Sequence, residues 1–235
     1  MYFMMFVVGD PTGVRDDDET LGAWLEEGKR RGIRVHGAWL HGADRARTVR
    51  FRDGEVLVSD GPFTASDEWI VGFDILSADS IDDALDYAAR HPMAHSGSIE
   101  VREFWPLTRR RAKARPPRGR PGSTRYFMFV ATDTDPDQSP GGYSIREWTS
   151  EMTERGISID GDRLRPAEDA RTIRVRSGQT IVTDGPFTES KEWVAGYDLL
   201  QCVDLDEAIE VASKHPMARA GRLELRPVRR ADSAE

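Results

Sequence analysis

The chain has 235 residues, of which 38% are hydrophobic and 31% charged, and its formal net charge is −8 at pH 7. This is the composition of an ordinary globular protein, and the acidic balance argues against nucleic acid as the main partner. No apolar run reaches the roughly 18 residues that a membrane-spanning helix needs, so we expect no membrane segment. The single cysteine, Cys202, excludes an intrachain disulfide and favours a cytoplasmic location.

A long internal repeat organises the chain. The string SDGPFTASDEW, which contains Asp60, returns as TDGPFTESKEW, which contains Asp184. The strings Tyr-Phe-Met and His-Pro-Met-Ala also occur twice, at the same offset. Self-similarity over so long a period indicates a duplicated domain and not a solenoid of short repeats. We expect a first copy over residues 1–105, a linker over residues 106–124 and a second copy over residues 125–230.

The linker is rich in proline, glycine and arginine and contains no acidic residue. Such a composition is typical of a segment without secondary structure. Its positive charge allows two interpretations, a tether for nucleic acid or an acidic partner, and a solvated strap that lies across two acidic domains. We favour the strap because both flanking copies are acidic.

Both copies predict the same elements in the same order. The first copy predicts a strand over 2–8, a helix over 19–32, a hairpin over 47–61, a strand over 68–76, a helix over 80–91 and a strand over 98–105. The hairpin turns at Asp53-Gly54, a dipeptide that favours tight turns between strands. Ser80 and Asp204 are placed to cap the second helix of each copy.

This order of elements predicts an α+β fold made of two ferredoxin-like domains. An open sheet with helices on one face leaves its other face bare. Packing one sheet on the other would cover both bare faces, so we expect a pseudo-dimeric α/β barrel within one chain. The sequence leaves open whether this intrachain pseudo-dimer forms a further homodimer.

One histidine and one aspartate in each copy are the sharpest catalytic candidates. His91 and His215 are the histidines that occupy equivalent positions, and Asp60 and Asp184 precede Gly-Pro in both copies. An aspartate beside an imidazole would orient it and stabilise its charge, and the imidazole would act as general acid or base. The alternative is that each aspartate caps its own turn and each histidine caps its helix.

Other polar residues retained in both copies are candidates for substrate binding. They are Arg50, Arg52, Ser66 and Glu68 in the first copy and Arg174, Arg176, Ser190 and Glu192 in the second. Arginines at alternate positions of a strand share one face, where they would suit a carboxylate substrate if that face lines a cavity. No metal-ligand spacing, phosphate-binding loop or nucleotide fingerprint is present, so we expect no metal or cofactor.

The motifs Y-F-M, D-G-P-F-T, G-Y-D-L, H-P-M-A and E-L-R-P resemble the YCII-related, or DGPF, domain family over nearly the whole of both copies. The resemblance implies ferredoxin-like domains paired as a dimeric α/β barrel, with a His–Asp dyad as the active site. Carried over, the dyads are His91 with Asp60 and His215 with Asp184.

For function, the resemblance implies a cofactor-independent lyase, isomerase or dehydrochlorinase that acts on a small organic molecule. Members of the family are also encoded beside extracytoplasmic-function sigma factors. The alternative is therefore a non-catalytic protein that binds a small molecule or regulates such a sigma factor.

Overall fold

The protein consists of two compact units that do not coincide with the two sequence copies. A computed structural model describes residues 1–9, 18–64, 68–105, 120, 122–133, 144–188 and 192–229. Unit 1 comprises residues 1–40, 66–112 and 164–189, and unit 2 comprises residues 41–65, 113–163 and 190–235. Unit 1 therefore consists of most of the first copy and residues 164–189 of the second, and unit 2 consists of most of the second copy and residues 41–65 of the first.

Unit 1 is an antiparallel sheet with the strand order β10-β9-β6-β1-β5-β2. Its strands are β1 (Tyr2–Gly9), β2 (Arg34–Trp39), β5 (Trp69–Ser77), β6 (Ser98–Glu103), β9 (Arg171–Arg176) and β10 (Gln179–Asp184). Its helices are α1 (Asp18–Arg31), α2 (Ile81–Ala89), α3 (Met93–Ser96) and the short 3₁₀ helix η3 (Ala167–Asp169). The four strands β6-β1-β5-β2, with their two helical crossovers, form a ferredoxin-like sheet.

Unit 2 repeats this architecture with the strand order β4-β3-β12-β7-β11-β8. Its strands are β3 (Arg47–Arg52), β4 (Glu55–Asp60), β7 (Thr124–Thr132), β8 (Ser158–Arg163), β11 (Trp193–Cys202) and β12 (Arg222–Pro227). Its helices are the 3₁₀ helix η1 (Ala43–Arg45), α4 (Ile145–Glu154), α5 (Leu205–Lys214) and α6 (Met217–Ala220). The fold is therefore α+β, and the prediction of two ferredoxin-like sheets is confirmed. The further expectation, that one sheet packs on the other as a barrel, stays a prediction.

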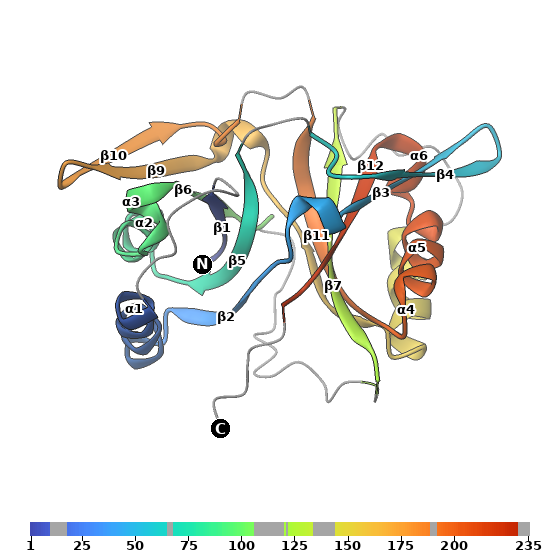
Figure 1. Ribbon diagram of the computed structural model, residues 1–235, viewed down its shortest axis with the longest axis horizontal. Helices are drawn as coiled ribbons and strands as arrows, with labels where there is room; N and C mark the ends of the chain where they lie inside the picture. Colours follow the sequence, from blue (N-terminus) through green and yellow to red (C-terminus); the bar gives the residue numbers. More distant parts are fainter. Residues whose placement is uncertain are drawn as a thin grey trace. The chain divides into compact units, whose positions relative to one another are not determined.

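The two copies exchange their β-hairpins. The β3–β4 hairpin comes from the first copy, but β3 pairs with β12 of the second copy through Val49 and Leu223. The β9–β10 hairpin comes from the second copy, but β9 pairs with β6 of the first copy through Ile173 and Ile99. Figure 1 shows the orange β9–β10 hairpin beside the green β6, and the blue to teal β3–β4 hairpin beside the red β12.

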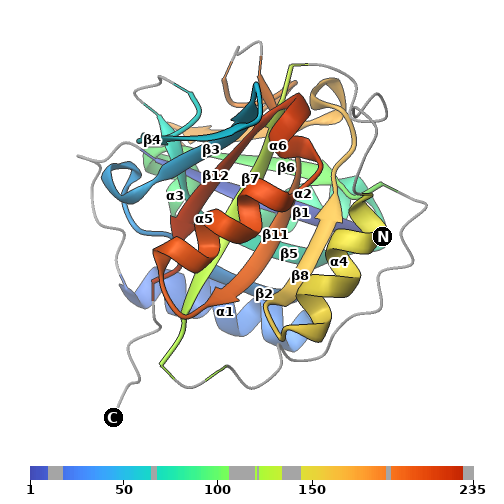
Figure 2. The same cartoon turned by 90° about the vertical axis from the view of Figure 1, so that its right-hand side faces the viewer.

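The helices of each unit cover one face of its sheet and enclose an apolar core. In unit 1, alternate residues of β1 (Phe3, Met5 and Val7) are buried against Trp24 of α1 and Tyr87 of α2. In unit 2, Met128 of β7 and Leu200 of β11 are buried with Trp148 of α4 and Val211 of α5. Figure 2 looks onto this face of unit 2, with α4 and α5 in front of the strands.

Local signals account for the ends of the elements. Ser80 and Asp204 each accept a hydrogen bond from the backbone N–H three residues later, so both predicted caps are confirmed. The predicted hairpin turn is confirmed too, since Asp53 and Gly54 both adopt positive φ, as a tight hairpin turn requires.

Two parts of the predicted order need correction. The strands β2 and β8 were not predicted, because their polar and glycine-containing sequences RVHGAW and SIDGDR carry a weak strand signal. The second helix of the first copy is also shorter than predicted. It ends at Ala89, so that His91 lies beyond its C-cap and before the separate helix α3.

Candidate functional site

The DGPF motif ends the exchanged hairpin in each copy. Asp60 is the last residue of β4, and Gly61 after it adopts a φ of 93°, a conformation that glycine tolerates best. The Asp60 carboxylate is 88% exposed and lies 3.0 Å from Nε of Arg47. Asp184 repeats this arrangement, since it is 87% exposed and lies 3.1 Å from Nε of Arg171. Both aspartates therefore form ion pairs at the surface of their own hairpin.

In each DGPF motif, the backbone N–H of the phenylalanine donates a hydrogen bond to a buried glutamate of the other copy. The backbone N–H of Phe63 donates to Oε2 of Glu224 at 3.0 Å, and Glu224 also pairs with Arg226. The backbone N–H of Phe187 donates to Oε2 of Glu100 at 3.1 Å, and Glu100 pairs with Arg102. All four charged side chains are buried. The motif thus anchors the exchanged hairpin to the last strand of the other copy.

The retained histidine of unit 2 lies beside a buried aspartate. Nε2 of His215 is 3.7 Å from Oδ2 of Asp198, while Nδ1 accepts a hydrogen bond from the backbone N–H of Met217 at 3.1 Å. The indole of Trp148 stands edge-on to the imidazole, with 4.7 Å between the ring centres. His215 is 4% exposed and the Asp198 side chain 12%, so both groups are largely withdrawn from solvent.

Burial sets the protonation state of this pair. It lowers the pKa of His215 to about 3, so the imidazole is neutral at pH 7. Burial also raises the pKa of Asp198 well above its usual range, and the nearby Asp160 and Asp162 raise it further. Because Nδ1 accepts the N–H of Met217, the single proton of the neutral imidazole lies on Nε2, which is therefore a donor that faces Asp198. The group of this pair that can both release and take up a proton is the carboxyl group of Asp198, and Nε2–H of His215 can orient it.

Unit 1 contains the same groups in a different electrostatic setting. His91 is buried, its Nδ1 accepts the backbone N–H of Met93, and burial together with Arg34 lowers its pKa to about 3. Asp74 is buried too, but Nε of Arg34 donates to its Oδ1 at 2.6 Å. Burial raises the pKa of Asp74 to about 6, against the opposing effect of Arg34 and His36.

A glycine opposite each buried aspartate makes room for the carboxyl group. A Cβ atom at Gly161 would lie 2.3 Å from Oδ1 of Asp198, and one at Gly37 would lie 1.8 Å from Oδ1 of Asp74. Neither glycine has a positive φ, so the lack of space for a Cβ atom, and not the backbone conformation, explains why glycine stands at these positions.

The dyads that the sequence predicts join residues of different units, since Asp60 belongs to unit 2 and His91 to unit 1, while Asp184 belongs to unit 1 and His215 to unit 2. The pairing of Asp60 with His91 and of Asp184 with His215 therefore stays a prediction. The carboxyl group next to His215 is Asp198, which sequence reasoning left out of the site. Its signal was present, because a polar aspartate recurs inside the apolar strings GFDIL and GYDLL.

Two of the four hairpin arginines, Arg52 and Arg176, donate hydrogen bonds to backbone carbonyl groups at the end of a helix. Arg176 donates to the carbonyl groups of Ala94, His95 and Gly97 around the end of α3, at 2.8–3.0 Å. Arg52 likewise donates to the carbonyl groups of Ala218 and Arg219 at the end of α6. Both arginines therefore satisfy orphan carbonyls at a helix C-terminus, which gives them a structural role.

Two further predicted binding residues, Glu68 and Glu192, lie beside the other two arginines. Arg174 forms an ion pair with Glu68 at 3.6 Å in unit 1. In unit 2, Glu192 pairs with Arg222 at 2.7 Å, and Arg50 lies in the same charged group. Ser66 and Ser190 lie outside the described residues, as does most of the linker. Within the described part of the chain, no three histidine, cysteine, aspartate or glutamate side chains could share a metal ion.

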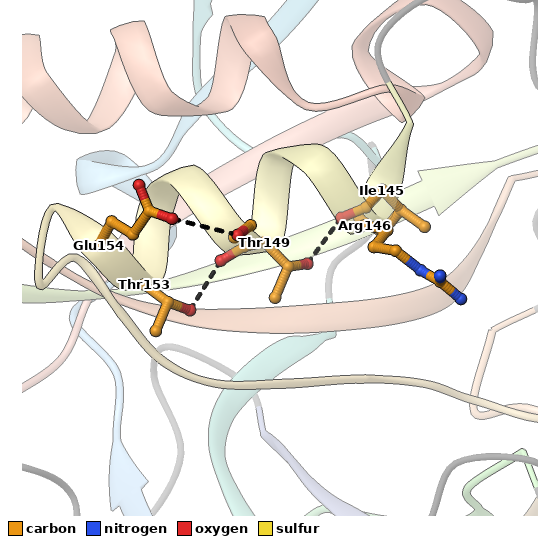
Figure 3. Close-up of a pocket in the computed structure, with 6 residues that line it drawn as sticks. Ile145, Arg146, Thr149, Thr153 and Glu154 are labelled. Atoms are coloured by element: carbon orange, nitrogen blue, oxygen red, sulfur yellow. Dashed lines mark hydrogen bonds between the residues drawn. The ribbon is translucent and has the colours of Figure 1, made fainter.

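A shallow depression on the surface of α4 is separate from these groups. It is lined by side chains of α4 alone, among them Ile145, Thr149 and Thr153 (Figure 3). The hydroxyl groups of Thr149 and Thr153 donate to the carbonyl oxygens of Ile145 and Thr149 within the helix, each at 2.7 Å. These two hydroxyl groups are therefore engaged by the helix itself.

The ferredoxin-like units and the repeated motifs define a tandem α+β domain protein, and comparison with known proteins identifies its family. The model of the YCII-related domain matches residues 1–108 and 134–232, so the chain belongs to the YCII-related domain family. An uncharacterized protein of Rhizobium meliloti (strain 1021) is 44% identical over 68 residues, which is 28% of this chain. The matched region spans about half, 55%, of the length of that relative.

Among solved structures, the chain is similar to one described as "Putative Chlorite dismutase". The sequence identity is 12% and the TM-score 0.41, over 98% of this chain and 95% of the other. Among the described residues, none of the helices is long and apolar enough to cross a membrane.

Proposed function

We propose that the chain is a cofactor-independent acid–base enzyme that acts on a small organic molecule, with His215 and Asp198 as its catalytic pair. The observation that supports this is the 3.7 Å separation of Nε2 of His215 from Oδ2 of Asp198 in a buried setting. The reaction class is that of a lyase, isomerase or dehydrochlorinase, as the family resemblance implies.

The chemistry follows from the two protonation states. The ionised form of the Asp198 carboxyl group, whose raised pKa makes it a stronger base than an ordinary aspartate, can take a proton from a carbon atom of the substrate, and the electron pair left behind can expel a leaving group or shift a double bond. The carboxyl group formed in this way can return the proton to the product or to the leaving group, while Nε2–H of His215 can donate a hydrogen bond to the carboxylate. Every proton is thus exchanged between the substrate and Asp198.

Unit 1 is less suited to this role. Arg34 binds Asp74 at 2.6 Å and favours its ionised form, so Asp74 is the weaker base of the two aspartates. We therefore place the activity in unit 2 and expect His91 to contribute less to turnover than His215.

Proton transfer can be tested before the substrate is known. The full-length protein is incubated in D₂O with a small-molecule cell extract, and mass spectrometry then detects compounds that gain deuterium on carbon. We expect the wild type to label at least one compound and the variants His215→Gln and Asp198→Asn to lose the labelling. The variant His95→Gln, which changes an exposed histidine, is the control and should label as the wild type does.

Two results would contradict the proposal. Labelling that survives in Asp198→Asn would exclude this carboxyl group as the proton acceptor. If the immobilised wild type and the immobilised variant His215→Gln both bind the same compound from the extract and neither labels it, the chain is instead a non-catalytic small-molecule-binding protein. Regulation of a sigma factor is the remaining alternative that the family resemblance implies. It predicts that the immobilised chain binds a protein from the extract and no metabolite.

A further inference from the structure

A second charged site lies on the opposite face of the unit 2 sheet. Val49 and Phe51 flank Arg50 in β3 and contribute to the core beneath the helices, so Arg50 points to the other face. Arg222 precedes the core residue Leu223 and lies on that same other face. Asp198 alternates with the core residues Leu200 and Cys202, which places the acid–base pair on the helix side.

The guanidinium groups of Arg50 and Arg222 keep unused hydrogen-bond donors. Nε of each is buried and has no hydrogen-bond partner among the residues that the structure describes. Arg222 is held in place because its Nη1 donates to the carbonyl oxygen of Phe63 at 2.9 Å and to Glu192 at 2.7 Å. A buried donor without a partner costs free energy, which a ligand with acceptor atoms would recover.

The charges around Arg50 also favour an anion. Burial lowers the pKa of Arg50, and the nearby Arg222 and Arg52 lower it further, while Glu192 and Asp133 oppose this to a smaller extent. The cations therefore outweigh the acids at this position. An anionic group placed between Arg50 and Arg222 would relieve their repulsion and accept hydrogen bonds from both.

Unit 1 lacks the equivalent pair of arginines. The counterpart of Arg50 is Arg174, which forms an ion pair with Glu68 at 3.6 Å. The counterpart of Arg222 is Ser98, a small and fully buried residue. The two copies therefore differ in the residue that would complete an anion site.

We propose that unit 2 binds the carboxylate of a small organic molecule between Arg50 and Arg222, at a site that unit 1 does not have. The side chain of Glu192 already forms an ion pair with Arg222, which indicates that the Arg222 guanidinium can bind a carboxylate. The half-buried ring of Phe63, 6.5 Å from that of Phe129, offers an apolar wall for the body of the ligand. The proposal does not depend on the acid–base pair.

Binding of benzoate to the full-length protein, measured by titration calorimetry, tests the site. We expect saturable binding that Arg50→Gln weakens by about tenfold or more, since a charge-assisted hydrogen bond is lost. Arg125→Gln, an equal change of charge at an exposed position of β7, should leave the affinity unchanged. Because Arg50 has an unused donor and cationic neighbours, Arg50→Gln should not lower the urea midpoint of unfolding.

Three results would overturn the proposal. One is the absence of saturable benzoate binding to the wild type. Another is an equal loss of affinity in Arg174→Gln, which would remove the assignment to unit 2. The third is tighter binding of inorganic phosphate than of benzoate, which would reject the carboxylate as the ligand class. Loss of deuterium labelling in His215→Gln is measured separately, so failure of either proposal leaves the other testable.

Discussion

At the scale of single residues, the two copies keep the same buried aspartate and change what surrounds it. Asp74 has Arg34 at 2.6 Å, whereas Asp198 has Asp160 and Asp162 as its charged neighbours on β8. The pKa of both carboxyl groups is raised by burial, but only Asp74 has a cation that opposes the change. One duplicated position thus provides a carboxylate in unit 1 and a group that tends to stay protonated in unit 2.

The raised pKa of Asp198 predicts how stability changes with pH. Its folded-state pKa exceeds the unfolded value, so the folded state binds more protons and stability falls as pH rises from about 4 upward. Asn cannot ionise, so we expect Asp198→Asn to gain stability relative to the wild type as pH rises. Urea unfolding at a series of pH values measures this, and an identical pH dependence in both proteins would contradict it. Asp74→Asn is the comparison: the folded pKa of Asp74 is also raised, but only to about 6, so this variant should gain stability relative to the wild type between about pH 4 and pH 6 and no further above that.

The lowered pKa of His215 predicts the opposite slope. The unfolded histidine binds a proton below about 6.5, whereas the folded one binds it only near pH 3, so stability is lost as pH falls through this range. His215→Gln should flatten that loss. The imidazole signals of His215 in NMR spectra should show no titration down to about pH 4, and a midpoint near 6.5 would refute the assignment.

At the scale of elements, the DGPF motif is explained by the hairpin that it ends. The N–H of Phe63 reaches a buried glutamate, Glu224, on a strand of the other copy, and Thr48 donates to the carbonyl oxygen of Gly61 at 2.9 Å. Gly185 and Phe187 repeat both features. Aspartate and glycine therefore recur because the one forms an ion pair within the hairpin and the other adopts a positive φ, whereas the hydrogen bond at the phenylalanine uses its backbone N–H.

Removal of the buried glutamate tests this anchor. In Glu224→Leu, Arg226 stays buried without its carboxylate and Phe63 loses its acceptor, so we expect a loss of about 3–5 kcal/mol of unfolding free energy. The double variant Glu224→Leu/Arg226→Leu should lose less than Glu224→Leu, because no unpaired charge remains. Urea unfolding checks both, and an equal loss would contradict the ion pair as the cause.

The glycine of the motif gives a milder test. Gly61 adopts a φ of 93°, and a Cβ atom there would meet no other atom within 4 Å, so backbone strain is the only penalty. Gly61→Ala should cost about 1 kcal/mol of stability. Gly22→Ala is the control, because that glycine lies within α1 with open space around it and without a positive φ, so alanine should stabilise it.

At the scale of the whole molecule, each sheet needs strands from both copies. The first copy alone provides β6-β1-β5-β2 of unit 1 but not the β9–β10 hairpin, and its own β3–β4 hairpin belongs to the other sheet. Each sheet therefore takes two of its six strands from the other copy.

Cleavage of the linker tests this dependence. A protease site inserted within residues 106–119 would allow the folded chain to be cut into its two copies. We expect the halves to stay together in size-exclusion chromatography under native conditions and to separate in denaturant, because main-chain hydrogen bonds and buried glutamates join them. Separation of the halves without denaturant would contradict the hairpin exchange.

The sequence by itself determined the duplication, the family, the four longer helices α1, α2, α4 and α5, and all strands except β2 and β8. These depend on local periodicity, capping residues and turn dipeptides, which a short stretch of chain carries within itself. It also identified His215 and the arginines of the hairpins as candidates.

Only the tertiary structure decided which sheet each hairpin joins and which carboxyl group lies beside His215. The edges of β6 and β12 have almost the same sequence pattern, so local signals cannot tell one partner from the other. Asp198 and His215 likewise lie on a strand and after a helix, and long-range packing alone brings them to 3.7 Å. Pairing at long range depends on the energy of the whole fold, which no short segment specifies.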